Sequence, residues 1–472
     1  MTKLSDIPVR VEIYDALADW QVHTGEGEKV VARRVKGRFR TLKNYSMSIW
    51  LIYFLGPYLR WDGHQAVLFD IPNQQFHLFG MTLFPQDIWV LSLTLLFFAI
   101  LLAAATSIAG RVFCGYFCFQ TVWTDMFTFI EGKLEGNTPS KAHKFKKTPM
   151  SANKAIRKAT KHVIWLAIAV LTGITFSAWF MDAYQLWSEI VTLQAPVPVW
   201  VAMGIFTFFT YWFAGFMREQ VCFWLCPYAR LQGVMYDQET VLPAYDAVRG
   251  EPRGKLSRSG QTENQGSCID CKLCVAVCPT GIDIRKGQQE GCITCGLCID
   301  ACDSIMDKID QPRGLIRYAS YKELHQGKTR VSLLKRPRVL VYSSIMMLSV
   351  VGVIYGFASF SPTFFTVTPE RQPLYVQMSN GEIQNKYTLK LLNKTNETLN
   401  VRYSISGLDT ANVEGLDQVI SIEPGKMVPT TALVRVDPAN VPRDSLNDFK
   451  FTVEADNAEH IADSYNAVFI VP

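Results

Sequence analysis

Five stretches of the chain are rich in apolar side chains and contain no charged residue: 44–59, 88–110, 163–181, 190–217 and 339–369. A helix that spans a membrane needs about 17–25 predominantly apolar residues. Four stretches meet this length, and 44–59 lies just below it. Its aromatic flank, Tyr53, Tyr58 and Trp61, is typical of a membrane interface. The pattern therefore predicts five transmembrane helices.

Positive charges alternate between the segments that these stretches separate. Nine Lys and Arg residues precede residue 44, one lies in 60–86, ten lie in 111–162, none lies in 182–189 and 18 lie in 218–338. Cytoplasmic loops of membrane proteins carry the excess of Lys and Arg. We therefore expect a multi-pass protein of the bacterial inner membrane, with a cytoplasmic N-terminus and a periplasmic C-terminus.

The C-terminal part of the chain has a different pattern, with short β-rich runs between Pro, Gly, Asn and Asp residues. About 100 residues with strands at this spacing predict an antiparallel β-sandwich. The predicted strands are Tyr387–Leu392, Asn400–Ile405, Val419–Ile422, Thr431–Val436, Phe449–Val453 and Ala467–Val471.

Composition supports a chain that is part membrane protein and part soluble protein. Its 472 residues are 49% hydrophobic and only 19% charged, with a net charge of +5. This excludes a disordered chain. Residues 360–472 carry 9 Lys and Arg against 14 Asp and Glu, whereas the rest of the chain is basic. No basic stripe with interleaved aromatics is present, so nucleic acid is not an expected partner.

All 12 cysteines lie between Cys114 and Cys302, and they are clustered. This distribution favours metal or redox chemistry over a disulfide framework. Eight of them form two runs of the Cys-x2-Cys-x2-Cys-x3-Cys type, which begin at Cys268 and Cys292. That spacing is typical of bacterial ferredoxins that hold two [4Fe–4S] clusters. Two zinc sites are a poor alternative, because such sites rarely use eight cysteines in this duplicated order.

The fourth cysteine of each run is expected to bind the cluster of the other run. One predicted cluster therefore has the ligands Cys268, Cys271, Cys274 and Cys302. The other has Cys278, Cys292, Cys295 and Cys298. This predicts an electron relay in the cytoplasmic segment 218–338.

The remaining four cysteines form two Cys-x3-Cys pairs, Cys114 with Cys118 and Cys222 with Cys226, which follow the second and fourth predicted spans. If each pair is helical, its members lie on one face of the helix. The four thiolates are then expected to converge between two neighbouring helices. Soft thiolates select Cu(I), zinc or an iron–sulfur centre. Two further interpretations remain: the four cysteines are buried packing residues, or each pair is a reversible dithiol.

The sequence resembles the cytochrome c oxidase accessory protein family known as CcoG, FixG or RdxI. The resemblance rests on the segments Gly110–Trp123 and Arg218–Arg230, the ferredoxin run Cys268–Pro279 and the β-rich tail. It covers nearly the whole chain. The family has proline after the second cysteine of each Cys-x3-Cys motif, and here Phe119 replaces the first of these prolines.

The resemblance implies reduction of Cu(II) to Cu(I) for the copper centre of a cbb-type cytochrome c oxidase. On this basis we expect a catalytic, copper-binding site at Cys114, Cys118, Cys222 and Cys226. It also implies a homodimer, an immunoglobulin-like C-terminal domain and contacts with copper chaperones or other assembly factors. The electron donor is not identified by the sequence. Two alternatives stay open: a quinol-linked electron-transfer subunit that feeds a periplasmic reductase, and a non-enzymatic copper-binding scaffold.

The expected architecture is a multi-domain membrane protein. It joins an α-helical bundle embedded in lipid, a ferredoxin-like module with two [4Fe–4S] clusters and an all-β immunoglobulin-like sandwich. The predicted boundaries are 1–43 for the N-terminal segment, 44–242 for the membrane domain, 243–267 for a linker, 268–312 for the ferredoxin module, 313–338 for a connection, 339–361 for the fifth span and 362–472 for the periplasmic domain.

Overall fold

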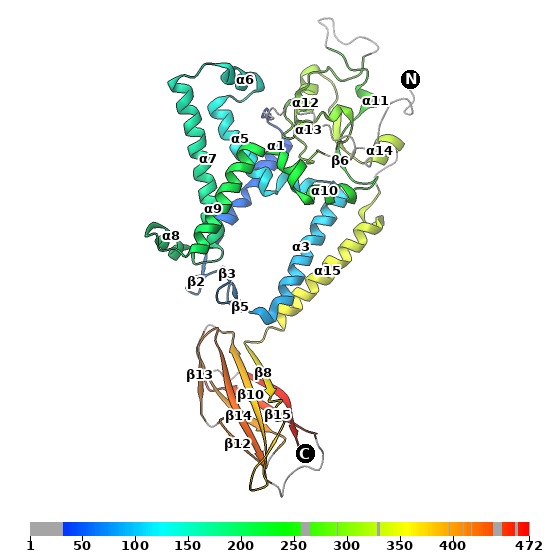
Figure 1. Ribbon diagram of the computed structural model, residues 1–472. Coiled ribbons are helices and arrows are strands. Elements are labelled where there is room, and N and C mark those ends of the chain that lie inside the picture. Colours follow the sequence, from blue (N-terminus) through cyan, green and yellow to red (C-terminus); the bar gives the residue numbers. More distant parts are fainter. Residues whose placement is uncertain are drawn as a thin grey trace. The chain divides into compact units, whose positions relative to one another are not determined.

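The computed structural model describes residues 32–255, 265–289, 291–327, 331–395, 397–408, 410–416, 418–437, 446–457 and 461–471. The chain forms two compact units, both drawn in Figure 1. The first comprises Met1–Tyr58 and Ser92–Val351, and the second comprises Leu59–Leu91 and Gly352–Pro472.

Within the described residues, four helical segments have the length and composition of membrane spans. They are η5 (Pro85–Asp87) with α3 (Ile88–Ala109), α7 (Ala152–Ala178), α9 (Val197–Trp212) with the π-helix η6 (Phe213–Met217), and α15 (Pro337–Ala358). They coincide with the last four predicted stretches. The predicted fifth span, 339–361, corresponds to α15, which begins two residues earlier and ends at Ala358.

The first predicted stretch, 44–59, is divided in the structure. α1 (Arg38–Ser48) and α2 (Trp50–Leu55) are separated by a turn at Ile49, and the 3-10 turn η4 (Gly56–Tyr58) follows. Pro57 lacks a backbone N–H and cannot continue the helical ladder. Neither helix alone has the length of a span. The predicted count of five spans is therefore not confirmed.

Helix packing in the first unit centres on α5 (Phe119–Glu135), α7 and α9. The indole of Trp165 on α7 stacks on Phe127 of α5 at a centroid distance of 5.1 Å, and both rings are fully buried. Gly173 of α7 meets α9 so closely that an added Cβ would lie 2.7 Å from the carbonyl oxygen of Met203. These contacts hold α5, α7 and α9 together, and the N-cap residue of α5 is Cys118.

Short elements make up the rest of the first unit. They are α4 (Val112–Tyr116), α6 (Pro139–Lys147), α8 (Ala183–Val191), η7 (Val221–Leu225), α10 (Pro227–Met235), β6 (Leu242–Tyr245), α11 (Ala247–Gly250), α12 (Leu273–Ala276), η8 (Ile284–Lys286), α13 (Leu297–Met306), η9 (Asp307–Ile309), β7 (Ile316–Ala319), α14 (Tyr321–Gln326) and η10 (Leu333–Lys335).

The start of the predicted linker 243–267 is part of the ferredoxin module instead. β6 pairs antiparallel with β7, and Tyr245 belongs to the same buried cluster as Cys268 and Cys274. The Gly, Ser and Arg content of this segment favours a loop, but burial of its few apolar side chains against β7 outweighs that preference. Residues 256–264 lie outside the described residues.

The second unit contains a sandwich of two antiparallel sheets, visible as the group of long arrows in Figure 1. One sheet has the order β12-β14-β10-β8 with β9 beside β10, and the other has the order β13-β11-β15-β16. The strands are β8 (Thr363–Pro369), β9 (Val376–Gln377), β10 (Ile383–Asn393), β11 (Leu399–Ser406), β12 (Ala411–Glu414), β13 (Ile420–Ile422), β14 (Met427–Val436), β15 (Leu446–Ala455) and β16 (Ala462–Ile470).

The sandwich confirms the predicted C-terminal β domain. All six predicted strands are present, and Leu389, Phe451 and Phe469 are fully buried between the sheets. β8 has no separate strand signal in the sequence, because its apolar residues continue the hydrophobic stretch of the preceding helix. β9 and β12 have only 2 and 4 residues, too few for a recognisable strand pattern.

The segment before α3 also belongs to the second unit. It forms the hairpin β1 (Arg60–Trp61) and β2 (His64–Gln65) and a three-stranded sheet of β3 (Val67–Asp70), β4 (Gln75–Leu78) and β5 (Met81–Leu83). The buried ammonium of Lys394 in the sandwich contacts both carboxylate oxygens of Asp87, at 2.9 and 2.8 Å. This ion pair joins the sandwich to the start of α3.

Candidate functional site

The eight ferredoxin-type cysteines line two cavities. One cavity is lined by Cys268, Cys271, Cys274 and Cys302. The other is lined by Cys278, Cys292, Cys295 and Cys298, with Cys274 in its wall. The last cysteine of each run therefore lies with the first three of the other run, which is the grouping that the crossed ligand assignment expects.

The donor set of each cavity fits a [4Fe–4S] cluster. Four thiols face a wall that is otherwise mainly apolar, with Ile284 and Leu297 in one cavity and Met306 and Leu315 in the other. Burial raises the pKa of the thiols of Cys274, Cys292 and Cys302 to about 12. Thiols with such pKa values stay protonated near neutral pH, and they lose their protons only when they bind a metal centre.

The backbone repeats itself in the two runs. Asp270 and Thr294, each directly before the second cysteine of its run, have φ angles of 53° and 57°. Lys272 and Gly296, each directly after it, have φ angles of 56° and 70°. Successive residues with unusual φ turn backbone N–H groups toward one side, where they can donate to an anionic group. The duplication seen in the cysteine spacing thus extends to the conformation of the residues between the cysteines.

The second cysteine set, here called the four-cysteine site, comprises Cys114, Cys118, Cys222 and Cys226. Cys114 lies in α4 and Cys222 lies in η7. Cys118 and Cys226 have extended backbone and are the N-cap residues of α5 and α10. The predicted placement of each pair on one face of a single helix is therefore wrong, because the first helix of each pair ends before the second cysteine.

The departure from the family pattern at Phe119 does not change this arrangement. Phe119 and Pro227 are both the first residue of the helix that follows the second cysteine. Proline is favoured at this position because its missing N–H needs no partner there. Other residues are tolerated at the same place, and α5 starts without a proline.

The four thiols lie near one another. Burial, together with the other thiols of the site, raises the pKa of Cys114 and Cys222 to about 12. Burial also raises the pKa of Cys118, with a contribution from Cys226. The thiol of Cys114 donates to Oε1 of the buried Gln232 at 3.3 Å. Across the described part of the chain, no three His, Cys, Asp or Glu side chains are placed to share a single ion.

The four-cysteine site is in direct contact with the ferredoxin loop, defined here as residues 292–298. An added Cβ at Gly115 would lie 2.5 Å from the carbonyl oxygen of Ile293. The hydroxyl of Tyr116 donates to the carbonyl oxygen of Cys295 at 2.9 Å. The backbone N–H of Arg111 donates to Oγ1 of Thr294 at 3.0 Å. The segment that carries Cys114 is therefore docked on the loop that carries three predicted cluster ligands.

The segment before Cys222 is an irregular helix. η6 and η7 are both π-helices, and between them Arg218 has a φ of 48°. π-helical turns and left-handed non-glycine residues cluster at functional sites. The amide of Gln120 on α5 donates to the carbonyl oxygens of Phe213 and Arg218, at 3.0 Å each. These bonds tie the Cys222 segment to the helix that Cys118 caps.

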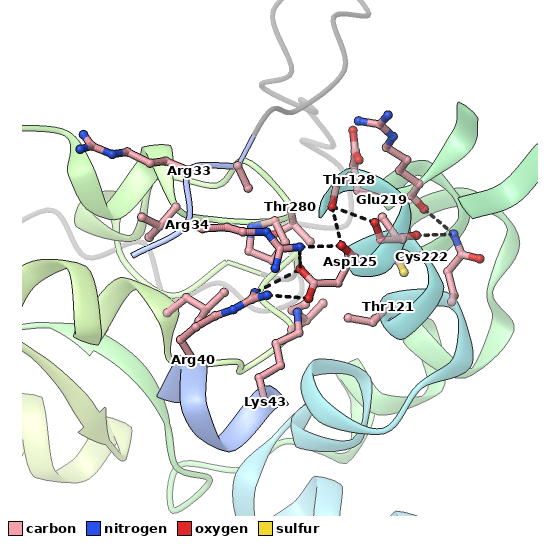
Figure 2. A pocket seen from close by; sticks show the side chains of 18 of the residues that line it. Arg33, Arg34, Arg40, Lys43, Thr121, Asp125, Thr128, Glu219, Cys222 and Thr280 are labelled. Atoms are coloured by element: carbon pink, nitrogen blue, oxygen red, sulfur yellow. Dashed lines mark hydrogen bonds and ion pairs between the residues drawn. The ribbon is translucent and has the colours of Figure 1, made fainter. Parts of the chain in front are cut away.

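A cavity of about 60 Å³ lies beside the two cysteine sets and is shown in Figure 2. Its lining includes Cys222 from the four-cysteine site and Ile293 from the ferredoxin loop. In Figure 2, Arg34 and Arg40 converge on Asp125, and the side chain of Lys43 extends toward the same carboxylate. No sequence motif marks this cavity. Four of its five basic residues belong to the segment that precedes the first apolar stretch, where the sequence shows only an excess of positive charge.

Comparison with known families identifies iron–sulfur regions in both cysteine sets. A 4Fe-4S dicluster domain matches residues 217–321, and a 4Fe-4S binding domain matches residues 91–136. The second match contains Cys114 and Cys118. An IG-like fold at the C-terminal of FixG matches residues 353–472.

Curated relatives cover most of the chain. Protein RdxB of Cereibacter sphaeroides is 40% identical over 394 residues, which are 80% of this chain and 82% of that protein. Protein RdxA of the same organism is 39% identical with the same coverage. Nitrogen fixation protein FixG of Rhizobium meliloti is 35% identical and covers 94% of this chain, matched over 93% of its own length. A crystal structure of a FixG-related protein from Vibrio parahaemolyticus covers 24% of this chain and 97% of its own, with 24% identity and a TM-score of 0.22.

Proposed function

The chain belongs to the FixG family of iron–sulfur proteins, and we propose that it is a membrane-bound oxidoreductase that reduces Cu(II) to Cu(I) at the four-cysteine site. The observation that carries this proposal is the docking of the Cys114 segment on the ferredoxin loop, through Gly115 and Tyr116. A soft-metal donor set and a predicted electron relay thus share one interface.

Copper reduction requires a source of single electrons and a site that binds Cu(I). Each reduction adds one electron to Cu(II), and a one-electron donor outside the chain must supply it. Bound [4Fe–4S] clusters would store and pass single electrons. The four thiols bind the product better than the substrate, because thiolates are soft ligands that select Cu(I). Each thiol releases its proton as the metal binds.

The direct test uses a variant in which Cys114, Cys118, Cys222 and Cys226 are all replaced by Ser. Purified protein would be reduced anaerobically and mixed with Cu(II), and a Cu(I)-specific chelator would report the rate. We expect at least a tenfold loss of rate with the iron content of the ferredoxin module retained. An unchanged rate would exclude the four-cysteine site as the place of reduction.

A further iron–sulfur centre is the second candidate role for these four thiols. The match of residues 91–136 to a 4Fe-4S binding domain favours it specifically. The two roles predict different iron contents for the variant Cys222→Ala. Under copper binding the iron content stays at the parent level. Under a third cluster it falls by roughly a third, since one cluster of three is lost.

The proposed membrane arrangement places the ferredoxin module in the cytoplasm and the sandwich in the periplasm of a bacterial inner-membrane protein. It follows the Lys and Arg distribution and requires the stretch 44–59 to supply a fifth crossing, in addition to the four spans. Leu51, Ile52 and Leu55 support this crossing, because each is more than half exposed, as lipid-facing side chains would be.

The destination of the copper is proposed from family resemblance. We infer that Cu(I) is passed to assembly factors or copper chaperones of a cbb-type cytochrome c oxidase, and that the protein acts as a homodimer. Deletion of the gene should lower the activity of that oxidase at limiting copper and spare it when copper is abundant. Cross-linking in membranes would test the dimer.

A further inference from the structure

A buried ammonium group lies at the cavity of Figure 2 without a hydrogen-bond partner. The Lys43 side chain on α1 is 1% exposed, and its Nζ makes no hydrogen bond within the part of the chain that the structure describes. Burial of an unpaired ammonium is strongly unfavourable. A negatively charged group must therefore offset it.

The carboxylates of this cavity are too few to do so. Five cationic side chains line it (Arg33, Arg34, Arg40, Lys43 and Arg218), against the two carboxylates Asp125 and Glu219. Arg218 is paired with Glu131 outside the lining. Arg33 is exposed, and its side chain points away from Asp125 in Figure 2. That leaves three cations (Arg34, Arg40 and Lys43) and two carboxylates, a surplus of one positive charge (3 − 2).

Asp125 is already occupied by other cations. Arg40 donates to both of its carboxylate oxygens, at 3.1 and 2.9 Å, and Arg34 donates to one of them at 3.0 Å. Burial raises the pKa of Asp125, but Lys43, Arg34 and Arg40 together bring it below its ordinary value. Asp125 is therefore a single negative charge shared among several cations.

The position of Lys43 on α1 directs it toward the ferredoxin loop. Phe39 and Ser46 lie four residues before and three residues after it, and so share its helix face. Phe39 packs so closely on Gly296 that an added Cβ there would lie 2.8 Å from the ring. The hydroxyl of Ser46 donates to the carbonyl oxygen of Tyr116, and the Tyr116 hydroxyl donates to that of Cys295.

The N-terminus of α1 is fixed to the same module. The carboxylate of Asp300 on α13 accepts hydrogen bonds from the backbone N–H groups of Phe39 and Arg40, at 3.1 and 2.8 Å. These two bonds cap α1 from across the interface. The face of α1 that carries Lys43 is therefore held against the ferredoxin module by contacts that do not involve Lys43 itself.

We propose that Lys43 is the internal counter-charge of the cluster that Cys278, Cys292, Cys295 and Cys298 are predicted to hold, and that it raises the reduction potential of that cluster. Four thiolates make this site anionic, and reduction adds one more negative charge next to the ammonium. The potential of an iron–sulfur cluster depends on such local charge. The inference rests on the iron–sulfur part of the proposed function and is independent of copper reduction.

The test is a redox titration of the full-length protein without copper, followed by electron paramagnetic resonance. In Lys43→Met, one of the two clusters should become harder to reduce by at least tenfold in its reduction equilibrium. For a one-electron couple this is about 59 mV. The other cluster should keep its midpoint potential. Lys43→Arg, which retains the charge, should stay close to the parent protein.

Lys36→Met is the matched control, because Lys36 precedes α1 and is exposed. Both of its midpoints should equal those of the parent. Unchanged midpoints in Lys43→Met with full iron content would overturn the proposal, as would an equal shift of both clusters. If Lys43→Met loses iron, Lys43→Gln is titrated in its place, and the same outcomes decide. A shifted potential with normal copper reduction, or the reverse, separates this inference from the proposed function.

Discussion

Gly115 is the residue at which the four-cysteine site touches the backbone of the ferredoxin loop. It lies between Cys114 and Cys118, inside the short helix α4, and has no side chain to hold the loop away. Cysteine spacing alone predicts that both cysteine sets exist and does not show that they meet. The contact depends on the absence of a Cβ at one position, which becomes visible only when both segments are placed in space.

Gly115→Ala should therefore weaken the interface between the two sites. The new Cβ would lie 2.5 Å from the carbonyl oxygen of Ile293, so the backbone must move apart. Overpacking of this kind costs about 1–3 kcal/mol. We expect copper reduction to slow at least tenfold while the iron content is retained.

Gly204→Ala on α9 is the control, because nothing lies within 4 Å of its added Cβ. It should reduce copper at the parent rate. A Gly115→Ala protein that also does so would show that this contact is not needed for the reaction.

Lys394 is a second residue whose role is not apparent from the sequence. It follows Asn393 in a run that reads as an exposed turn, yet its side chain is only 4% exposed and pairs with Asp87. Loss of one partner of a buried pair leaves the other charge uncompensated, at a cost of about 3–5 kcal/mol.

Lys394→Met should lower the free energy of unfolding of the second unit by about 3 kcal/mol, as measured by hydrogen exchange of its strands. Lys386→Met provides the comparison, since its pair with Glu370 is 47% and 41% exposed. Exposed pairs contribute about 0–1 kcal/mol. Equal effects of the two substitutions would contradict the structural role of the Asp87 pair.

At the scale of elements, the sequence predicts those helices and strands that a local hydrophobic pattern determines. Strands such as β10 and β15 follow from alternating apolar positions, and α3 follows from its long apolar run. The π-helices around Arg218 leave no such signal, because their geometry is set by contacts such as those of Gln120. The docking of α1 is also hidden, since it depends on a cap supplied by Asp300, far along the chain.

The number of membrane crossings depends on the first apolar stretch, 44–59. If the stretch 44–59 crosses the membrane, the hairpin that contains Gly63 lies in the periplasm. Alkaline phosphatase fused after Gly63 should then be active, and a fusion after Met150, in the next basic segment, should be inactive. Inactivity of the first fusion would remove the fifth span and the sidedness inferred from it.

At the scale of the whole molecule, the two cysteine sets are adjacent in space. We nevertheless expect the two ferredoxin clusters to form without the four-cysteine site. Cys302 lines the cavity of Cys268, Cys271 and Cys274, although it lies 28 positions after Cys274 in the sequence (302 − 274). Cys226 lies outside both ferredoxin cavities, at the N-cap of α10. A cluster nucleated by one run therefore depends on a residue of the other run, and not on the cysteines next to the membrane.

Cys302→Ser should remove the cluster that the first run nucleates, and with it about half of the iron in the two ferredoxin cavities. Cys226→Ser should retain both of these clusters, because each cavity already has the four thiols that its cluster needs without Cys226. Iron analysis and the resonance signals of the reduced proteins would measure both outcomes. If Cys302→Ser keeps all of its iron, the crossed assignment is wrong, and each run would have to complete its own cluster. If instead Cys226→Ser loses one of the two ferredoxin signals, the separation of the cysteines into two independent sets fails.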